Sequence, residues 1–439
     1  MMRVSHFNTF PYGGAGIAAR RLNKHLGKLG LESKLYYRRS DREKAVDPGS
    51  SLVQLAPMVA KSDSSRTPLF HRHRAKRRLR QIWRLHNDHI AMREPGQETF
   101  SMARLPEAEQ LNWMKVNADV AHLHWISFFA DYPEFFKSIP AHVPLVFTLH
   151  DMNAFTGGCH YSNGCEKFSN GCGTCPQVVN ASPRDVSVNS FEAKRKSLAG
   201  RNIHVVAPCE WMLNLAQKSP IWSDSTSFHH IRYGFNLKKF HAVDREHARR
   251  QLGIKSDAVL IGFGADDVKS PRKGVTHLLD ALGLLSASES VECLVYGGGD
   301  IEPRGNTPKL HRLGYVDSID RLRLIYSAAD VFVVPSMEDN QPQVGLEAMA
   351  CGTPLVAFDT CGIPEMVHHG KNGLLATTGD AMELAKQISW LVGNPEARLQ
   401  MGEAARAYME ENHDSILQAK KYSLLYKNAT QFGRRLKVA

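Results

Sequence analysis

The sequence predicts an α/β protein made of two doubly wound domains. Its 439 residues exceed the ~250–300 at which a single hydrophobic core stops growing, so two domains are expected. Apolar segments of strand length alternate with helical patterns through most of the chain. That alternation is typical of parallel sheets covered by helices on both faces. It occurs in two sets, one in each half, and each set predicts one doubly wound domain.

The predicted elements can be placed by residue number. Those in the first half are strands at 3–8, 119–126, 143–150 and 202–208, with an amphipathic helix at 17–30. Those in the second half are strands at 258–265, 292–299, 330–336 and 354–359, with helices at 275–287 and 318–329. The pattern is interrupted near 231–244 by a glycine, an aromatic pair and a basic turn. We expect one domain over 1–235, a second over 236–415, and a C-terminal helix over 416–439 that packs back on the first domain.

Composition and the lengths of the apolar runs exclude several classes of protein. Hydrophobic residues make up 43% and charged residues 23% of the chain, close to the average for soluble globular domains. These values argue against disordered, fibrous and small disulfide-rich proteins. No apolar run approaches the ~18–20 residues that span a bilayer, and the first residues lack the apolar region of a secretory signal. These features predict a cytoplasmic protein.

The basic excess is confined to the first 200 residues. Lys and Arg number 55 against 44 Asp and Glu, a net charge of +11, and the first 200 residues carry 28 basic and 17 acidic side chains. Residues 70–86 hold seven bases, no acid and interleaved apolar side chains. The segment is typical of a surface helix attracted to an anionic membrane, here the inner face of the plasma membrane, or of a solvated helix. No nucleic-acid recognition motif accompanies the charge, so no nucleic-acid partner is expected.

Half of the cysteines lie in one loop. Cys159, Cys165, Cys172 and Cys175 are spaced C-x5-C-x6-C-x2-C in a segment rich in glycine and asparagine. In a reducing compartment, four thiols in one loop favour a structural tetrahedral Zn²⁺, with His160 as a substitute ligand. Free or redox-active thiols and disulfides are the alternatives. A catalytic zinc is not expected, because four thiolates leave no open coordination position.

A short helix with a carboxylate in its middle is the most informative segment of the second half. Pro342 and Gly352 mark its start and its end, as is typical of helix termini, and the helix is apolar nearly all round, which predicts burial. A buried Glu347 needs hydrogen-bond donors, which the two hydroxyls of a ribose can supply. Asp339 and its neighbour Glu338 precede the helix, whose first backbone N–H groups can bind an anion. The alternative is a surface turn and an ordinary helix whose glutamate forms a salt bridge.

Three further groups are candidates for ligand contacts. Arg272 and Lys273 precede a glycine and a helix and can stabilise a diphosphate leaving group; the alternative is a solvated basic loop. Gly14 and Gly16 follow the first strand and allow the backbone to approach a ligand closely. A plain tight turn is the alternative there, because the dinucleotide fingerprint is incomplete. His150 ends a strand, where ligands bind in open parallel sheets.

Two more histidines, His122 and His124, alternate along the strand at 119–126. Residues two apart on a strand point to the same face of the sheet, so both rings should lie on one side. A core histidine whose ring nitrogens are satisfied by neighbours is favoured over a catalytic role for either.

The second half resembles the donor-site region of family-4 retaining glycosyltransferases of the GT-B fold. Those enzymes carry two acidic residues separated by seven others and followed by an A-x-A/C-G-x-P run; here Asp339 and Glu347 precede AMACGTPLVA. The other matching pieces, in the family's order, are PRKGVTHLLDAL, VYGGG, LGYVDS, AADVFVVPS, GIPEMV and HGKNGLL. The chain departs from the family in having Asp at the first acidic position and no Arg in GFGADDVKS. The start of the cysteine loop, HDMNAFTGGCHY, resembles a polysaccharide-building subgroup.

The resemblance implies two Rossmann-like domains facing each other across a cleft, with the first on the acceptor side and the second binding a nucleotide-sugar donor. It implies retaining, metal-independent transfer of a sugar to a hydroxyl of a glycan or lipid-linked oligosaccharide in bacterial surface or exopolysaccharide synthesis. The residues implied at the reacting sugar and diphosphate are His150, Asp339, Arg272 and Lys273, and those implied against the donor are Glu347, Glu338, Gly14, Gly16, Val344 and Gly345. A nucleotide-sugar epimerase of the same fold and a non-catalytic membrane-associated binding protein are the alternatives.

Overall fold

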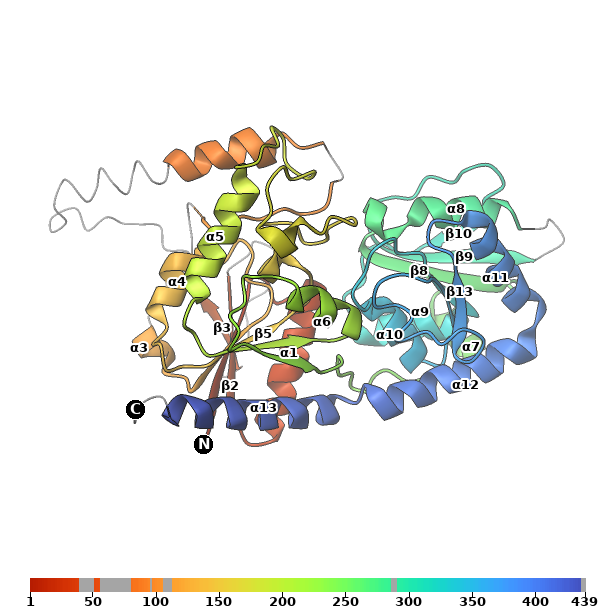
Figure 1. Ribbon diagram of the computed structural model, residues 1–439. Coiled ribbons are helices and arrows are strands. Elements are labelled where there is room, and N and C mark those ends of the chain that lie inside the picture. Colours follow the sequence, from red (N-terminus) through yellow and green to blue (C-terminus); the bar gives the residue numbers. More distant parts are fainter. Residues whose placement is uncertain (39–50, 56–79, 95–96, 106–112, 286–289, 436–439) are drawn as a thin grey trace. The chain divides into compact units, whose positions relative to one another are not determined.

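The computed structural model describes residues 1–38, 51–55, 80–94, 97–105, 113–285 and 290–435, and the chain divides into two compact units (Figure 1). Unit 1 comprises Met1–Pro208, Met212–Ile231 and the C-terminal segment from Ala419. Unit 2 comprises Cys209–Trp211 and Arg232–Gln418. The C-terminal helix therefore contributes most of its length to unit 1.

Unit 1 is built on a seven-stranded, wholly parallel sheet of order β3-β2-β1-β4-β5-β6-β7. Its strands are β1 (Arg3–Asn8), β2 (Glu32–Arg38), β3 (Leu52–Leu55), β4 (Val120–Leu123), β5 (Leu145–Thr148), β6 (Ile203–Ala207) and β7 (Ser227–His230). Its helices are α1 (Gly13–Lys28), a helix over 80–86, α3 (Trp113–Val116), α4 (Tyr132–Ser138), α5 (Val186–Leu198), most of α6 (Glu210–Gln217) and most of α13 (Ser415–Arg435).

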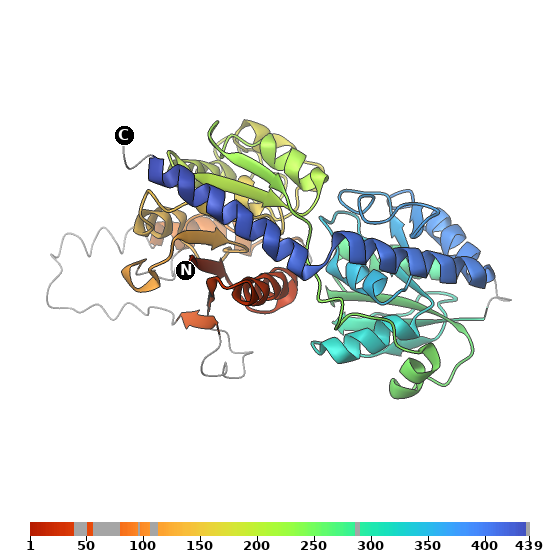
Figure 2. The same cartoon turned by 90° about the horizontal axis from the view of Figure 1, so that it is seen from below.

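The helices α1 and α13 cover one face of this sheet (Figure 2). Leu22 and Leu26 of α1 and two fully buried tyrosines of α13, Tyr422 and Tyr426, pack in one apolar cluster with strand residues such as Val120. Each side chain of this size contributes about 1.5–3 kcal/mol when it is fully buried. The last helix is therefore part of the core of unit 1.

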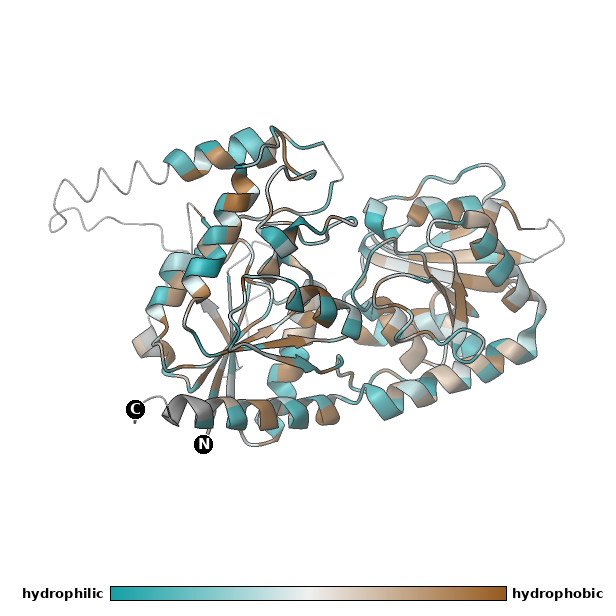
Figure 3. Ribbon diagram, in the orientation of Figure 1, coloured by the Kyte–Doolittle hydropathy of each residue, from teal (hydrophilic) through white to brown (hydrophobic). Residues whose placement is uncertain are grey.

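Unit 2 repeats the plan with a six-stranded parallel sheet of order β10-β9-β8-β11-β12-β13. Its strands are β8 (Val259–Asp267), β9 (Val291–Gly298), β10 (Leu310–Arg312), β11 (Val331–Val334), β12 (Leu355–Phe358) and β13 (Gly373–Ala376). Its helices are α7 (Arg245–Gln251), α8 (Val275–Gly283), α9 (Ile319–Ala328), α10 (Gln343–Ala350), α11 (Ala381–Gly393) and α12 (Pro395–Asn412). The central strands are almost uniformly apolar (Figure 3), as expected where helices cover both faces.

The predicted α/β class with parallel sheets is confirmed, and every strand predicted from the sequence overlaps a strand of the structure. Five strands were not predicted, namely β2, β3, β7, β10 and β13. Four of these, β3, β7, β10 and β13, lie at sheet edges, and they are short or polar, as in LHR and SFHH. Edge strands need no continuous apolar run, because one side of the strand and part of its faces meet solvent.

The structure describes only part of the basic segment at 70–86. Residues 70–79 lie outside the described residues, whereas 80–86 form a helix. Ile82 packs against Phe100 and Cys175, and Trp83 is 49% exposed. Within the described ranges, none of the helices combines the length and the apolar character that crossing a bilayer requires.

Each sheet has one point at which the strand order reverses, between β1 and β4 in unit 1 and between β8 and β11 in unit 2. Loops that leave neighbouring strands on opposite sides of such a point diverge and leave a crevice at the carboxyl ends of the strands. The loops after β1, β4, β8 and β11 are therefore where each unit is expected to hold a ligand.

Candidate functional site

In unit 2, close backbone contacts join the loops after β8 and β11. Arg272 and Lys273 lie in a short 3₁₀ turn that ends at Gly274, whose φ is +71°. A Cβ atom at Gly274 would lie 1.7 Å from the carbonyl oxygen of Pro335, so only glycine fits. The N–H of Met337 donates to the carbonyl of Arg272 at 2.8 Å. The basic turn is thus fixed against the end of β11.

Asp339 lies between the two basic side chains. Its Oδ2 accepts from Lys273 Nζ at 2.6 Å and from Arg272 Nη1 at 3.2 Å, and the residue is buried. Burial would raise the pKa of this carboxyl, but the charges of Lys273 and Arg272 outweigh it, and the pKa lies below its ordinary value. The cluster therefore holds two cations and one anion, a net positive site that can accept a diphosphate.

The neighbouring acids Glu338 and Asp339 occupy different positions in the structure. Glu338 is half-buried, and its backbone carbonyl accepts from Arg272 Nη1 at 2.8 Å. The carboxylate that meets Arg272 and Lys273 is that of Asp339. Asp339 thus occupies the place beside the basic pair.

Glu347 lies in the middle of α10 and is buried, as the sequence predicted. Its Oε2 accepts from the hydroxyl of Tyr326 at 2.9 Å, and that hydroxyl is 2.5 Å from the hydroxyl of Tyr296. A surface position does not describe this residue, and one partner of its carboxylate is the neutral hydroxyl of Tyr326. In the first turn of the same helix, Val344 is half-buried, and Gly345 is buried beneath Met366.

Gln341, which the sequence did not single out, is a further polar group beside Asp339. It is 3% exposed, and within the described part of the chain neither its Nε2 nor its Oε1 has a hydrogen-bond partner. A buried polar atom without a partner costs about 1–3 kcal/mol, and such groups commonly meet water or a ligand. The signal in the sequence was a polar residue placed directly before the helix-starting Pro342.

In unit 1, the glycine-rich turn after β1 starts helix α1. Gly13 has a φ of +69° and Gly14 is exposed. A Cβ atom at Gly16 would lie 2.4 Å from the carbonyl oxygen of Phe10, so tight packing explains this glycine. The predicted helix at 17–30 begins earlier than expected, because glycine takes the positive φ that the first turn needs.

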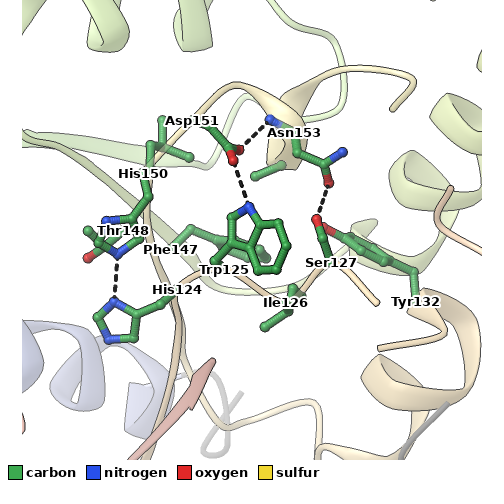
Figure 4. Close-up of a pocket in the computed structure, with 12 residues that line it drawn as sticks. His124, Trp125, Ile126, Ser127, Tyr132, Phe147, Thr148, His150, Asp151 and Asn153 are labelled. Carbon is green, nitrogen blue, oxygen red and sulfur yellow. Dashed lines mark hydrogen bonds between the residues drawn. The ribbon is translucent and has the colours of Figure 1, made fainter. Parts of the chain in front are cut away.

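His150 lies two residues beyond β5 and lines a small cavity with residues from the ends of β4 and β5 (Figure 4). Its Nε2 is 3.0 Å from Nδ1 of His124, and burial lowers the pKa of His150 to about 4. Beside it, Asp151 accepts from Trp125 Nε1 at 2.7 Å and lies 2.6 Å from Nδ1 of His160. At neutral pH, His150 is therefore a neutral ring held by a second histidine.

The four cysteines of the loop influence one another electrostatically. Burial raises the pKa of Cys159 to about 12 and that of Cys172 to about 11, and the neighbouring thiols add to both shifts. The charge of the fully buried Lys194 opposes the shift of both thiols. Residues 171–174 all have positive φ, including Cys172 and Thr174. Among the described residues, however, these thiols do not form a group of three that could hold a metal ion as they stand, so zinc binding stays a prediction.

Part of unit 2 is similar in sequence to known glycosyltransferases. Residues 258–394 match the family described as "Glycosyl transferases group 1". The D-inositol 3-phosphate glycosyltransferase of Streptomyces bingchenggensis is 32% identical over 198 residues, which are 41% of this chain and 43% of that protein. A GDP-mannose-dependent monoacylated alpha-(1-6)-phosphatidylinositol monomannoside mannosyltransferase of Corynebacterium glutamicum is 30% identical over 213 residues, 44% of this chain and 54% of that protein. The chain thus matches about half the length of these relatives.

Solved structures match nearly the whole chain. Sucrose-phosphate synthase of Thermosynechococcus elongatus has a TM-score of 0.67 and 18% identity, over 98% of this chain and 99% of that one. HepE of Anabaena, solved in complex with UDP and glucose, has a TM-score of 0.62 and 16% identity, over 98% of this chain and 100% of that one. At such low identities the likeness establishes the fold alone, and it confirms the GT-B fold expected from the sequence.

Proposed function

We propose that the chain is a glycosyltransferase that moves a sugar from a nucleotide-sugar donor to a hydroxyl of a glycan or lipid-linked acceptor, with retention of anomeric configuration. The observation that carries the proposal is the cluster of Arg272, Lys273 and Asp339 at the strand-order reversal of unit 2. The family match over residues 258–394 supports it. One relative, of Corynebacterium glutamicum, is a GDP-mannose-dependent mannosyltransferase, and HepE of Anabaena has been solved in complex with UDP-glucose, which supports a nucleotide-sugar donor.

The role of each residue in unit 2 follows from its surroundings. Glu347 is a buried acceptor at mid-helix and would bind the ribose hydroxyls. Arg272 and Lys273 would stabilise the charge that builds up on the departing diphosphate, as fixed cations in a water-poor site do. Asp339 holds both cations in place before the donor arrives and would orient the sugar. The backbone N–H groups at the start of α10, near Val344 and Gly345, complete an anion site.

No described residue stands out as a covalent nucleophile, since Asp339 is engaged by two cations. We propose that the acceptor hydroxyl attacks from the face that the diphosphate leaves. The acceptor's oxygen forms the new bond to the anomeric carbon, the bond to the diphosphate breaks, and the departing phosphate oxygen takes the hydroxyl proton. This route needs no metal ion, because the two basic side chains supply the positive charge.

The test compares Lys273→Ala with Lys309→Ala, a lysine of the same unit whose side chain pairs with Glu292. UDP-, GDP- and ADP-sugars are first screened by thermal shift, and the donor that binds is then used in a transfer assay with product analysis. Lys273→Ala and Glu347→Ala should abolish turnover and Lys309→Ala should retain it. Full activity in both site variants would refute the assignment. Donor consumption without any transferred glycan would indicate an epimerase instead.

We also propose that Cys159, Cys165, Cys172 and Cys175 hold a structural zinc ion, which would have to draw the four thiols together, since in the part of the chain described no three of them form a group that could hold a metal. Four thiolates on zinc carry a net negative charge, and the buried Lys194 lies where it would offset that charge. Metal analysis of the purified chain should give about one zinc per chain, and Cys172→Ser should remove it. Less than about 0.2 zinc per chain in the unaltered protein would reject the site. Serine keeps the size of the side chain but is a poor zinc ligand.

A further inference from the structure

Two buried tyrosines lie next to Glu347 in the core of unit 2. Tyr326 is on α9 and Tyr296 is on β9, and both are at most 5% exposed. The hydroxyl of Tyr326 donates to Oε2 of Glu347 at 2.9 Å, and the hydroxyls of the two tyrosines are 2.5 Å apart. A buried tyrosine usually finds a hydrogen-bond partner for its hydroxyl. Here two phenols and one carboxylate, from three different elements, are partners of one another.

The surrounding core holds the two rings in place. Tyr296 and Tyr326 meet edge to face, at an interplanar angle of 84°, and the ring of Phe332 lies 5.3 Å from that of Tyr326. A Cβ atom at Gly264 of β8 would lie 2.1 Å from a ring carbon of Tyr296, so a glycine inside this strand leaves the space that the ring fills. The side chain of Thr353 donates to the backbone carbonyl of Tyr326 at 2.7 Å. The positions of the hydroxyls are therefore fixed by packing within unit 2.

The carboxylate sets the direction of both hydrogen bonds. An ionised carboxylate only accepts, so the single proton of Tyr326 is directed to Glu347. The oxygen of Tyr326 must then accept from the hydroxyl of Tyr296. Burial, and then the charge of Glu347, raise the pKa of both phenols well above its ordinary value, so each keeps its proton at neutral pH. Hydrogen bonds in such a chain strengthen one another, and a bond to a charged acceptor is stronger than one to a neutral acceptor.

We propose that Tyr326 and Tyr296 are positioning residues that hold the carboxylate of Glu347 in one orientation, and thereby set a preference for ribonucleotides over deoxyribonucleotides. The inference rests on the proposed function, in which Glu347 binds the ribose hydroxyls. A glutamate side chain can adopt several rotamers, and ordering such a side chain during binding weakens affinity. Because the tyrosines fix the orientation before the nucleotide arrives, a ribose hydroxyl gains the full hydrogen bond. A deoxyribose that lacks this hydroxyl gains nothing from it.

The preference for ribose is the quantity to measure. UDP, GDP and ADP, and the 2′-deoxy and 3′-deoxy forms of whichever of them binds, are titrated into the purified full chain by calorimetry. The unaltered protein should bind the ribonucleotide at least about tenfold more tightly than one of the deoxy forms, as expected for a hydrogen bond to a charged acceptor. Tyr326→Phe removes only the hydroxyl and should reduce this ratio about threefold to tenfold, and Tyr296→Phe should reduce it less. A ratio in Tyr326→Phe that is unchanged, or that rises, would overturn the proposal.

Two controls separate positioning of Glu347 from a general loss of structure. Tyr408→Phe removes a hydroxyl of the same unit, one that donates to the backbone carbonyl of Glu365 at 2.7 Å, and should leave the ratio unchanged. If Tyr326 acts through Glu347, Tyr326→Phe should have no further effect on the ratio in a Glu347→Gln background. A merely structural tyrosine would weaken the binding of ribose and deoxyribose forms equally. That result, or an additive effect on the ratio in the double variant, would contradict the positioning role.

Failure of the inference and failure of the proposed function give different results. If none of the three nucleotides binds the unaltered protein, the proposed function fails, and the ribose preference fails with it. Binding without a preference for ribose keeps the nucleotide site and rejects the positioning role alone. Urea unfolding tests the pairing of the hydroxyls in either case. Tyr326→Phe leaves the hydroxyl of Tyr296 buried without its acceptor, so adding Tyr296→Phe should not lower the midpoint further. A midpoint that falls by the sum of the two single losses would show that the hydroxyls do not pair.

Discussion

Acidification from pH 7.5 to 5.5 is expected to destabilise unit 1 through its buried histidines. His6, His122 and His124 are at most 6% exposed, and burial lowers the pKa of each far below 6.5. In the unfolded chain the same rings titrate near 6.5. The unfolded state therefore binds protons that the folded state does not, and stability falls as the pH drops through 6.5.

The magnitude follows from the two pKa values of each ring. With an unfolded pKa near 6.5 and a folded pKa well below 5.5, each ring contributes a loss of about 1.4 kcal/mol between pH 7.5 and 5.5. The three rings together give about 4 kcal/mol, a large part of the 5–15 kcal/mol that is usual for a folded protein. Carboxyl groups with lowered pKa values, such as Asp151, act in the same direction but mainly below this pH window.

Urea unfolding at pH 5.5, 6.5 and 7.5 measures the effect, with hydrogen exchange of β1 and β4 reporting on unit 1 itself. Replacing one ring by an uncharged amide, in His122→Gln, should reduce the loss by about 1.4 kcal/mol, whatever it does to stability at pH 7.5. A free energy of unfolding that changes by less than about 1 kcal/mol across the window would refute the reasoning. An undiminished loss in His122→Gln would show that other groups are responsible.

Three further predictions concern unit 2, each read from urea or thermal unfolding. Gly274→Ala should destabilise the protein by more than about 2 kcal/mol, because a methyl group clashes with Pro335 at a positive φ. The control Gly283→Ala, in open space on α8, should be neutral or stabilising. Equal effects of the two variants would contradict the close approach of Gly274 to Pro335. Lys273→Ala should lower the free energy of unfolding by about 2 kcal/mol, because it removes a charged partner of buried Asp339, and adding Asp339→Asn should restore most of the lost stability. If the losses of the two substitutions add up in the double variant, the two side chains do not interact. Gln341→Leu should stabilise the unliganded protein by about 1 kcal/mol, because its amide has no partner among the described residues; a loss of stability would reveal a hidden partner.

Local patterns predicted the central strands and the site helix closely. β1 and α10 occur at the residues expected. A continuous apolar run predicts the strand, and a proline at the start and a glycine after the end predict the helix, and both are local signals. The strands β7 and β10 were missed because their residues, SFHH and LHR, carry no apolar run and are strands only through pairing with β6 and β9. Pairing with a neighbour cannot be seen in a short window of sequence.

In the candidate site, too, the sequence predicted some features, and others depend on contacts between distant residues. Motif spacing singled out Glu347, Asp339 and Lys273, and burial of Glu347 followed from the apolar character of its helix. Which acid meets the basic pair could not be decided from neighbouring positions in the sequence. It depends on the backbone of the loop after β11, which brings the carboxylate of Asp339 to Lys273 and the backbone carbonyl of Glu338 to Arg272.

The sequence by itself determined the α/β class, the two sheets and the residue types available for donor chemistry, because periodicity and motif spacing are properties of contiguous residues. Only the tertiary structure decided which side chains meet. Ser33 and His6 lie on β2 and β1, and His124 and His150 lie just beyond β4 and β5, so the four become neighbours through the order in which those strands pair. The contact between His124 and His150 is therefore decided by the order of the strands, which no local pattern of residues shows.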